Sequence, residues 1–205
     1  MSTVALTDAI SRLCGEAGLT PMARTVELCA TYVSLLSRWN ARMNLTALPL
    51  GLVPPDSSLL KLVVEPLCAV PFLGEFKGSW VDLGSGGGSP ALPLRAAVAG
   101  VGSLAMVEAR GRKCAFLREA VRQLGFSGVT VENVRFEELP RVEADLVTFR
   151  AVRADREFVD VVLGCLSSTG RVLSFGAAVD DPRLSITRTA SLPDGSTLFE
   201  LTRIG

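Results

Sequence analysis

The chain has 205 residues, of which 48% are apolar and 20% are charged, so disorder is excluded over most of its length. Its 21 basic and 21 acidic side chains give zero formal net charge, so binding to nucleic acid requires a local basic patch. Histidine is absent, which excludes Ser-His-Asp triads, histidine metal sites and a histidine general base.

Cysteine usage and the apolar segments favour a cytoplasmic protein. No two of the five cysteines form a Cys-x-x-Cys pair, which fits a reducing compartment. The first ten residues contain Asp8 and no Lys or Arg, unlike a signal peptide. The most apolar stretch, 59–73, is interrupted by Lys61 and Glu65, so it does not read as a membrane span. We expect a cytoplasmic protein that binds neither a membrane nor a metal ion.

The first third of the chain predicts helices. Apolar residues recur at helical spacing up to Gly18, which ends the first helix. Thr20 and Pro21 then predict an N-cap followed by proline at the first helical position. A later helix is interrupted by Pro66 and Pro71. The helices predicted in this part are 10–17, 21–44 and 59–70.

From Trp80 onward, short apolar strands alternate with helices. The alternation predicts a parallel sheet with helices on both faces, which is the doubly wound α/β class. Two segments in which apolar and polar residues alternate are joined by Pro193-Asp-Gly-Ser196, and this pattern predicts a final antiparallel hairpin. The predicted strands are 80–83, 103–107, 129–133, 145–149, 171–175, 184–192 and 197–204, and the helices between them are a segment ending at Gly100, 111–124 and 155–168.

A glycine-rich loop follows the first predicted strand, at the edge where an open parallel sheet binds its ligand. Its glycines, Gly84, Gly86 and Gly88, have the spacing G-x-G-x-G, and Ser89 stands where a dinucleotide fingerprint needs a third glycine. This spacing is typical of S-adenosylmethionine (SAM) sites and disfavours a nicotinamide oxidoreductase. The alternative is a tight turn between strand and helix that binds nothing.

An acid follows the loop at a spacing that suits a nucleoside. Glu108 ends the second predicted strand, twenty residues after Gly88. A carboxylate at this position can accept hydrogen bonds from both ribose hydroxyls. A solvated glutamate at a strand end is the alternative, but loop and acid together favour a SAM-type site. The residues after the fourth predicted strand, Thr148-Phe-Arg-Ala151, lack the Asn/Asp-Pro-Pro motif of enzymes that methylate exocyclic amines. Enzymes that methylate pyrimidine C5 need a nucleophilic cysteine in this region, and Cys165 lies beyond it in the next predicted helix.

Five segments share their residue pattern with one protein family. The longest, 32–47, contains Tyr-x-x-Leu-Leu-x-x-Trp-Asn-x-x-x-Asn-Leu-Thr and is similar to that family's N-terminal signature. The others are the loop 82–93, the stretch 108–117, the turn 135–138 and the pair Arg150-Ala151. Together they resemble the glucose-inhibited division protein B family, the bacterial guanine-N7 methyltransferases of 16S small-subunit ribosomal RNA (rRNA).

The resemblance implies a Rossmann-like class I methyltransferase fold, with S-adenosyl-L-methionine as cofactor and a guanine of 16S rRNA as substrate. We expect residues 1–75 to form an N-terminal helical cap and 76–205 the SAM-binding domain, in one compact unit. Guanine N7 already carries a lone pair at neutral pH, so its methylation needs no general base and the absence of histidine is no obstacle. Orientation of the reactants is then the main task of the protein.

The resemblance also assigns site residues. Phe136 and Glu137 would lie along the adenine, and Arg150 near the reacting end as the predicted catalytic residue, orienting the base or a phosphate. For Arg150 the alternative is a structural ion pair with a nearby acid, namely Asp145, Asp155 or Glu137. The full set of predicted cofactor-binding residues is Gly84, Ser85, Gly86, Gly88, Ser89, Glu108, Ala109, Phe136, Glu137 and Arg150.

Three departures from the family pattern leave other functions open. Lys61-Leu-Val-Val-Glu-Pro66 replaces Arg-His-x-x-Asp-Ser, Phe175-Gly176 replaces a Lys-Gly pair, and a basic C-terminal tail is missing. One alternative is a SAM-dependent methyltransferase for another RNA or a small molecule. The other is a SAM-binding protein that has lost turnover.

The expected partner is free small-subunit rRNA or an assembling subunit, bound by a monomer. A basic rim for RNA would consist of Arg38, Arg42, Arg112, Lys113 and Arg153, although interleaved acids also fit ordinary solvated faces. Trp39 and Tyr32 lie at helical spacing in the signature, which favours core positions over stacking on bases.

Overall fold

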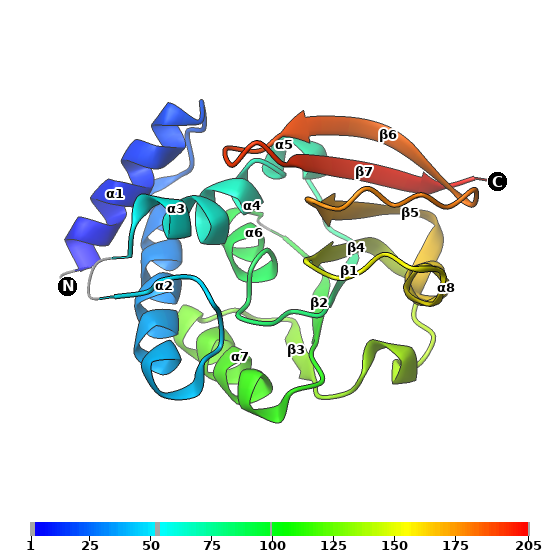
Figure 1. Ribbon diagram of the computed structural model, residues 1–205, viewed down its shortest axis with the longest axis horizontal. Coiled ribbons are helices and arrows are strands. Elements are labelled where there is room, and N and C mark those ends of the chain that lie inside the picture. Colours follow the sequence, from blue (N-terminus) through cyan, green and yellow to red (C-terminus); the bar gives the residue numbers. More distant parts are fainter. Residues whose placement is uncertain (1–2, 52–53, 99, 205) are drawn as a thin grey trace.

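The computed structural model describes residues 3–51, 54–98 and 100–204. Its centre is a seven-stranded sheet with the order β3-β2-β1-β4-β5-β7-β6 (Figure 1). Strands β1 to β5 pair in parallel, and β7 runs antiparallel to both β5 and β6. The strands are β1 (Ser79–Leu83), β2 (Ser103–Val107), β3 (Val129–Glu132), β4 (Ala144–Arg150), β5 (Leu166–Phe175), β6 (Leu184–Ser191) and β7 (Thr197–Arg203). The predicted α/β class, with its antiparallel end, is confirmed.

Helices cover the two faces of the sheet unequally (Figure 1). Side chains alternate between faces along a strand, so Trp80 and Val81 of β1 enter different cores. Trp80 packs with the N-terminal helices, α6 and α7, whereas Val81 packs with α8. The helices are α1 (Thr3–Glu16), α2 (Ala23–Met43), α3 (Asp56–Leu59), α4 (Glu65–Leu67), α5 (Val70–Leu73), α6 (Ala91–Ala97), α7 (Gly111–Leu124) and α8 (Arg156–Cys165), with a π-helical turn η1 (Leu60–Val64) and a 3-10 turn η2 (Phe136–Glu138).

The helix α2 connects the N-terminal segment to the rest of the molecule. It packs against α1 on one side and against α6 and α7 on the other. Its buried side chains belong to the same apolar cluster as Leu104 and Leu146 of the sheet. The division predicted at residues 75 and 76 stays a prediction. No helix in the described ranges is long and apolar enough to cross a membrane.

Several local predictions were wrong. The first helix begins at Thr3 rather than at residue 10, and the fifth strand begins at Leu166 rather than at residue 171. The helix expected over 155–168 ends at Cys165, because Leu166 is extended (φ −89°, ψ 128°) and pairs with Ala144 of β4. Leu166 is also buried, so pairing and burial together override its helical propensity. The N-cap of α2 is Met22 without a side-chain cap, rather than Thr20.

Candidate active site

The carboxyl ends of the parallel strands meet at one edge of the sheet, where open α/β sheets bind ligands. The loop after β1 contains the glycines, β2 leads to Glu108, and β4 and β5 end at Arg150 and Phe175. The topology therefore gathers at one edge residues that lie far apart in sequence.

Positive φ angles explain the glycines of the loop. The φ angles of Gly84, Gly86 and Gly88 are 73°, 54° and 93°. Residues with a Cβ rarely adopt this left-handed region. A Cβ on Gly88 would also lie 2.5 Å from the Leu92 side chain. The backbone N–H groups of Gly84 and Ser85 donate to the carbonyl of Val107, which fixes the loop to β2.

Glu108 is joined directly to this loop. One of its carboxylate oxygens accepts a hydrogen bond from the Gly86 N–H at 3.0 Å, and the other accepts from the Arg110 N–H at 2.8 Å. The residue is only 8% exposed. A carboxylate has about four lone-pair sites, so each oxygen keeps capacity for one more donor, such as a hydroxyl group.

Asp82, below the loop, is held by a directed chain of hydrogen bonds. The Trp80 indole N–H can only donate, and it donates to Thr148 Oγ1 at 2.8 Å. The Thr148 hydroxyl therefore donates its own hydrogen to Asp82 Oδ1, at 2.6 Å. The other oxygen, Oδ2, is buried and has no hydrogen-bond partner among the residues that the structure describes. Burial raises the pKa of Asp82 to about 6, although the Ser85 and Thr148 hydroxyl groups oppose the shift.

The helix α2 anchors the loop from the other side. Tyr32 is 1% exposed, and its hydroxyl donates to the carbonyl of Gly87 at 2.8 Å. A Cβ on Gly87 would lie 3.5 Å from Leu36, an ordinary van der Waals distance, so α2 packs against the loop at this residue. Burial raises the pKa of Tyr32, which keeps the hydroxyl protonated as a donor. Tyr32 is thus a core residue, as expected, and also a direct support of the site.

Arg150 lies under this edge, and its side chain is only 12% exposed. It donates to the backbone carbonyl of Lys61 and, at 3.4 Å, to Ser89 Oγ. Its guanidinium carbon lies 4.9 Å from the centre of the Phe175 ring, in the geometry of a cation–π contact. The family pattern has a lysine at this position. Phe175 instead contributes an aromatic ring that contacts the cationic side chain of Arg150.

The ion-pair partner of Arg150 is Glu65, which none of the sequence alternatives included. The two side chains are 3.1 Å apart, and Glu65 is 1% exposed. Lys61 lies 3.5 Å from Glu65 and also pairs with Asp194 in the β6–β7 turn. Burial lowers the pKa of Arg150 and raises that of Glu65, and their mutual attraction opposes both shifts. Of the three acids considered from sequence, Asp145 instead accepts from Ser79, and Asp155 caps α8.

The residues predicted along the adenine, Phe136 and Glu137, lie after β3 in the turn η2. Phe136 meets Phe158 edge to face, with ring centres 5.2 Å apart. Phe136 and Glu137 line a cavity of about 370 Å³, together with Val152. Ala109 is exposed, and its carbonyl accepts from Asn133 at 3.0 Å. A Cβ on Gly84 would lie 3.2 Å from Val152, so this cavity adjoins the glycine loop.

The cations of the predicted rim come from separate elements. Lys113, near the start of α7, places its Nζ 3.7 Å from a Cβ built on Gly86. Arg153, after β4, is 91% exposed and lies 3.9 Å from Asp155. The remaining members, Arg38 and Arg42 on α2 and Arg112 on α7, are exposed.

Comparison with known proteins identifies the family. The family model described as rRNA small subunit methyltransferase G (GidB) matches residues 25–190. The ribosomal RNA small subunit methyltransferase G of Nitratidesulfovibrio vulgaris (strain DP4) is 36% identical over 193 residues, which cover 91% of this chain and 82% of the relative. The chain belongs to this family. The protein of the same name from Stenotrophomonas maltophilia (strain K279a) is 34% identical over 168 residues, covering 80% and 73% of the two chains.

Solved structures agree on the fold. A SAM-dependent methyltransferase from Aquifex aeolicus superposes with a TM-score of 0.60 over 73% of this chain and 94% of that chain, at 12% identity. The family resemblance read from the sequence is therefore confirmed, and the cofactor that family and fold imply is S-adenosyl-L-methionine.

The residues present fit this cofactor. The glycine loop offers backbone without Cβ atoms, and Glu108 retains acceptor capacity for ribose hydroxyls. The unpartnered Oδ2 of Asp82 is a buried acceptor that suits a cationic group such as an ammonium.

Four residues of this family member were not predicted as site residues: Asp82, Thr148, Tyr32 and Glu65. Asp82 was visible as the acid directly before the loop. Glu65 had a signal too, because an acid inside the apolar stretch 59–73 must find a partner once buried. The role of Thr148 follows from strand register, which pairs it with Asp82, and a single sequence does not reveal that register.

Proposed function

We propose that this chain transfers a methyl group from SAM to N7 of a guanine in small-subunit (16S) rRNA. The observation that carries the proposal is the coincidence of family and site. The matched residues, 25–190, include α2, the glycine loop, Glu108 and Arg150, which meet at one edge of the sheet. The names of the relatives supply the small-subunit rRNA, and the N7 acceptor fits a site without histidine.

The reaction makes few demands on proton chemistry. When bound, SAM would supply an electrophilic methyl group, and the electron pair of the carbon–sulfur bond would remain on sulfur as the methyl group leaves. Guanine N7 attacks with its own lone pair, so no proton has to be removed and no general base is required. The positive charge passes to the base. The contribution of the protein is orientation and exclusion of water, and orientation alone is worth about 7–11 kcal/mol.

In this proposal the cofactor is held by the loop and its neighbours. Glu108 binds the ribose hydroxyls, Asp82 faces the cationic end of the methionine moiety, and Phe136 and Glu137 border the adenine. Arg150 orients the guanine or a flanking phosphate at the reacting end. The proposed cofactor contacts are Gly84, Ser85, Gly86, Gly88, Ser89, Glu108, Ala109, Phe136, Glu137 and Arg150.

The partner in this proposal is rRNA or an assembling subunit in the cytoplasm, met by a monomer along the rim of Arg38, Arg42, Arg112, Lys113 and Arg153. Three members of this rim, Arg112, Lys113 and Arg153, follow β2 and β4 at the carboxyl edge of the sheet. Exposed cations near the site favour contact with phosphates.

Mass mapping of 7-methylguanine tests the proposal. Small-subunit rRNA from cells that lack the protein should have lost the methyl group of one guanine present in the parent. Purified protein with labelled SAM should restore it in that RNA. An unchanged methylation map contradicts the proposal.

The paired charges at the reacting end favour one alternative, a SAM-binding protein without turnover. Arg150 and Lys61 each form an ion pair with an acid, so their positive charges are already partly neutralised in the described part of the chain. Binding of SAM without methyl transfer to any RNA would support that alternative, and transfer to another acceptor would redirect the choice of substrate.

A further inference from the structure

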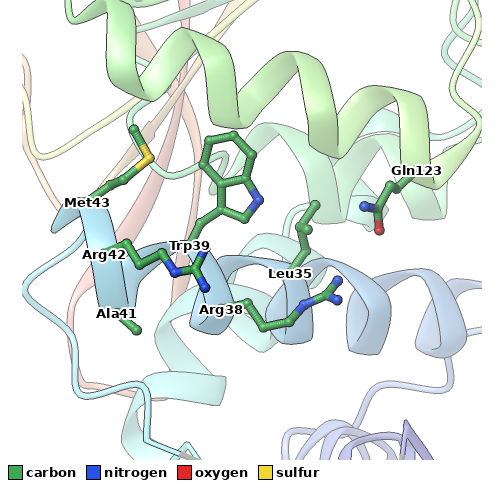
Figure 2. Close-up of a pocket in the computed structure, with 7 residues that line it drawn as sticks. All are labelled: Leu35, Arg38, Trp39, Ala41, Arg42, Met43 and Gln123. Carbon is green, nitrogen blue, oxygen red and sulfur yellow. The ribbon is translucent and has the colours of Figure 1, made fainter.

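A groove lies between α2 and α7, on the surface next to the site. Its volume is about 550 Å³, within the range of about 300–1,000 Å³ typical of small-ligand pockets. Figure 2 shows the Trp39 ring standing between the two helices, with two arginines along α2 and Gln123 on the α7 side. The residues that line this α2–α7 groove are Leu35, Arg38, Trp39, Ala41, Arg42, Met43 and Gln123.

The groove has positive charge from two arginines that form no ion pair with any residue the structure describes. Arg38 and Arg42 are four residues apart and therefore share one face of α2. Among the described residues, neither makes an ion pair, whereas Arg122 is paired. Glu119 interacts electrostatically with Arg38, but its carboxylate accepts hydrogen bonds from Arg122 and Gln123 at 2.8 and 2.6 Å.

Trp39 is a partly exposed aromatic side chain with a fixed orientation. Its ring meets the buried Phe116 ring at an angle of 64°, with centres 5.8 Å apart. This edge contact holds the indole from the protein side, while the remainder lines the groove. A rigid aromatic surface of this kind stacks on an unpaired nucleobase at little entropic cost.

The two helices that form the groove also border the glycine loop. Tyr32 of α2 donates to the Gly87 carbonyl, and the Nζ of Lys113 on α7 lies 3.7 Å from a Cβ built on Gly86. Trp39 follows Tyr32 by seven residues on α2, about 10 Å along the helix axis, which is a distance that a short stretch of RNA spans.

We infer that the α2–α7 groove binds one unpaired nucleotide of the substrate RNA close to the methylated guanine, with its base on Trp39 and its phosphates on Arg38 and Arg42. This inference rests on the proposed function. Apolar aromatic floor and cationic border are the combination that binds single-stranded nucleic acid. An acidic peptide would satisfy the arginines but leave the tryptophan face without a planar partner.

Two kinds of variant test the groove. Trp39→Leu keeps an apolar side chain against Phe116 but removes the stacking face, and Trp39→Phe restores an aromatic ring. Arg38→Gln and Arg42→Gln each remove one surface cation. Arg24→Gln is the matched control, because Arg24 lies on the same helix, is 71% exposed and does not line the groove.

Steady-state methylation of small-subunit RNA gives the first readout. Trp39→Leu should raise KM for RNA by about 5- to 100-fold, the contribution of one stacked base, with kcat and SAM affinity nearly unchanged. Trp39→Phe should recover most of the loss. The logarithm of the RNA-binding constant falls linearly with the logarithm of the salt concentration. Each arginine variant should make this slope shallower by about 0.7, and the control should leave it unchanged.

Fluorescence gives a readout independent of catalysis. A short unstructured RNA oligonucleotide should quench Trp39, because Trp80 is buried and hydrogen-bonded to Thr148. The duplex made from the same sequence should quench much less, since its bases are already stacked.

The outcomes separate the inference from the function on which it rests. Quenching without methyl transfer by the wild type supports the groove and overturns the proposed function. Methyl transfer with Trp39→Leu and both arginine variants equal to the control overturns the groove alone. Equal binding of duplex, or a loss seen only with assembled subunits and not with free RNA, also overturns it, the latter in favour of a ribosomal protein.

Discussion

The two ends of the candidate site are built by different means. At the cofactor end, Glu108 receives two hydrogen bonds from backbone N–H groups of adjoining segments. At the reacting end, Arg150 is oriented by side chains and carbonyls from distant segments, and Glu65 lies 3.1 Å away without a well-aligned hydrogen bond. Backbone geometry tolerates most changes of side chain, whereas a buried ion pair does not survive the loss of one partner.

At the cofactor end, a side chain added to the glycine loop should abolish cofactor binding. We expect Gly86→Asp to abolish SAM binding in calorimetry, because the new carboxylate would stand next to Glu108, which already accepts the Gly86 N–H. Gly125→Asp is the matched control, since Gly125 also has a positive φ, of 67°, with no atom near its Cβ position. The control should bind SAM normally, and normal binding by Gly86→Asp would remove the loop from the site.

The reacting end should fail in turnover rather than in cofactor binding. Arg150→Ala should lower kcat by about 100-fold or more, consistent with lost orientation, while SAM affinity changes little. It should also cost about 3–5 kcal/mol of unfolding free energy, because Glu65 is left buried without its partner.

A double variant separates these two effects. Arg150→Ala with Glu65→Gln removes the orphaned charge, so urea unfolding should show most of the stability restored. Methylation should stay low. Recovery of turnover together with stability would mean that Arg150 is only a structural ion pair.

Replacement of Asp82 should show how much stability the protein loses by keeping a buried carboxylate at the cofactor end. Its pKa is raised from 3.8 to about 6, so the folded protein binds the proton more tightly and its stability falls as pH rises through that window. Asp82→Asn lacks this effect. The unfolding free energy of the variant minus that of the wild type should rise by about 2 kcal/mol between pH 4 and pH 7, without SAM.

The weakest expected effect is at the surface of the reacting end. Lys61 and Asp194 are 36% and 32% exposed, and such pairs contribute about 0–1 kcal/mol. Asp194→Asn should therefore change the unfolding free energy by less than about 1 kcal/mol. A loss as large as that of Arg150→Ala would show that the β6–β7 turn is an essential part of the buried cluster.

Much of the fold could be read from the sequence because its signals are local. The bounds of β2 and α7 were predicted to the residue, since apolar period and a left-handed Gly125 mark them. The glycine loop and Glu108 were also predicted, because strand–loop–helix order and a spacing of twenty residues are properties of the chain itself.

Tertiary structure alone decided which distant groups meet. Arg150 has acids close by in sequence, yet it pairs with Glu65, because the turn η1 and α4 lie over the ends of β4 and β5. Strand register placed Thr148 beside Asp82, and helix packing left Trp39 in a groove instead of the core. The periodicity of apolar residues indicates which side chains lie on the same face of a helix or strand. Which residues meet across the fold depends on how the helices and strands pack.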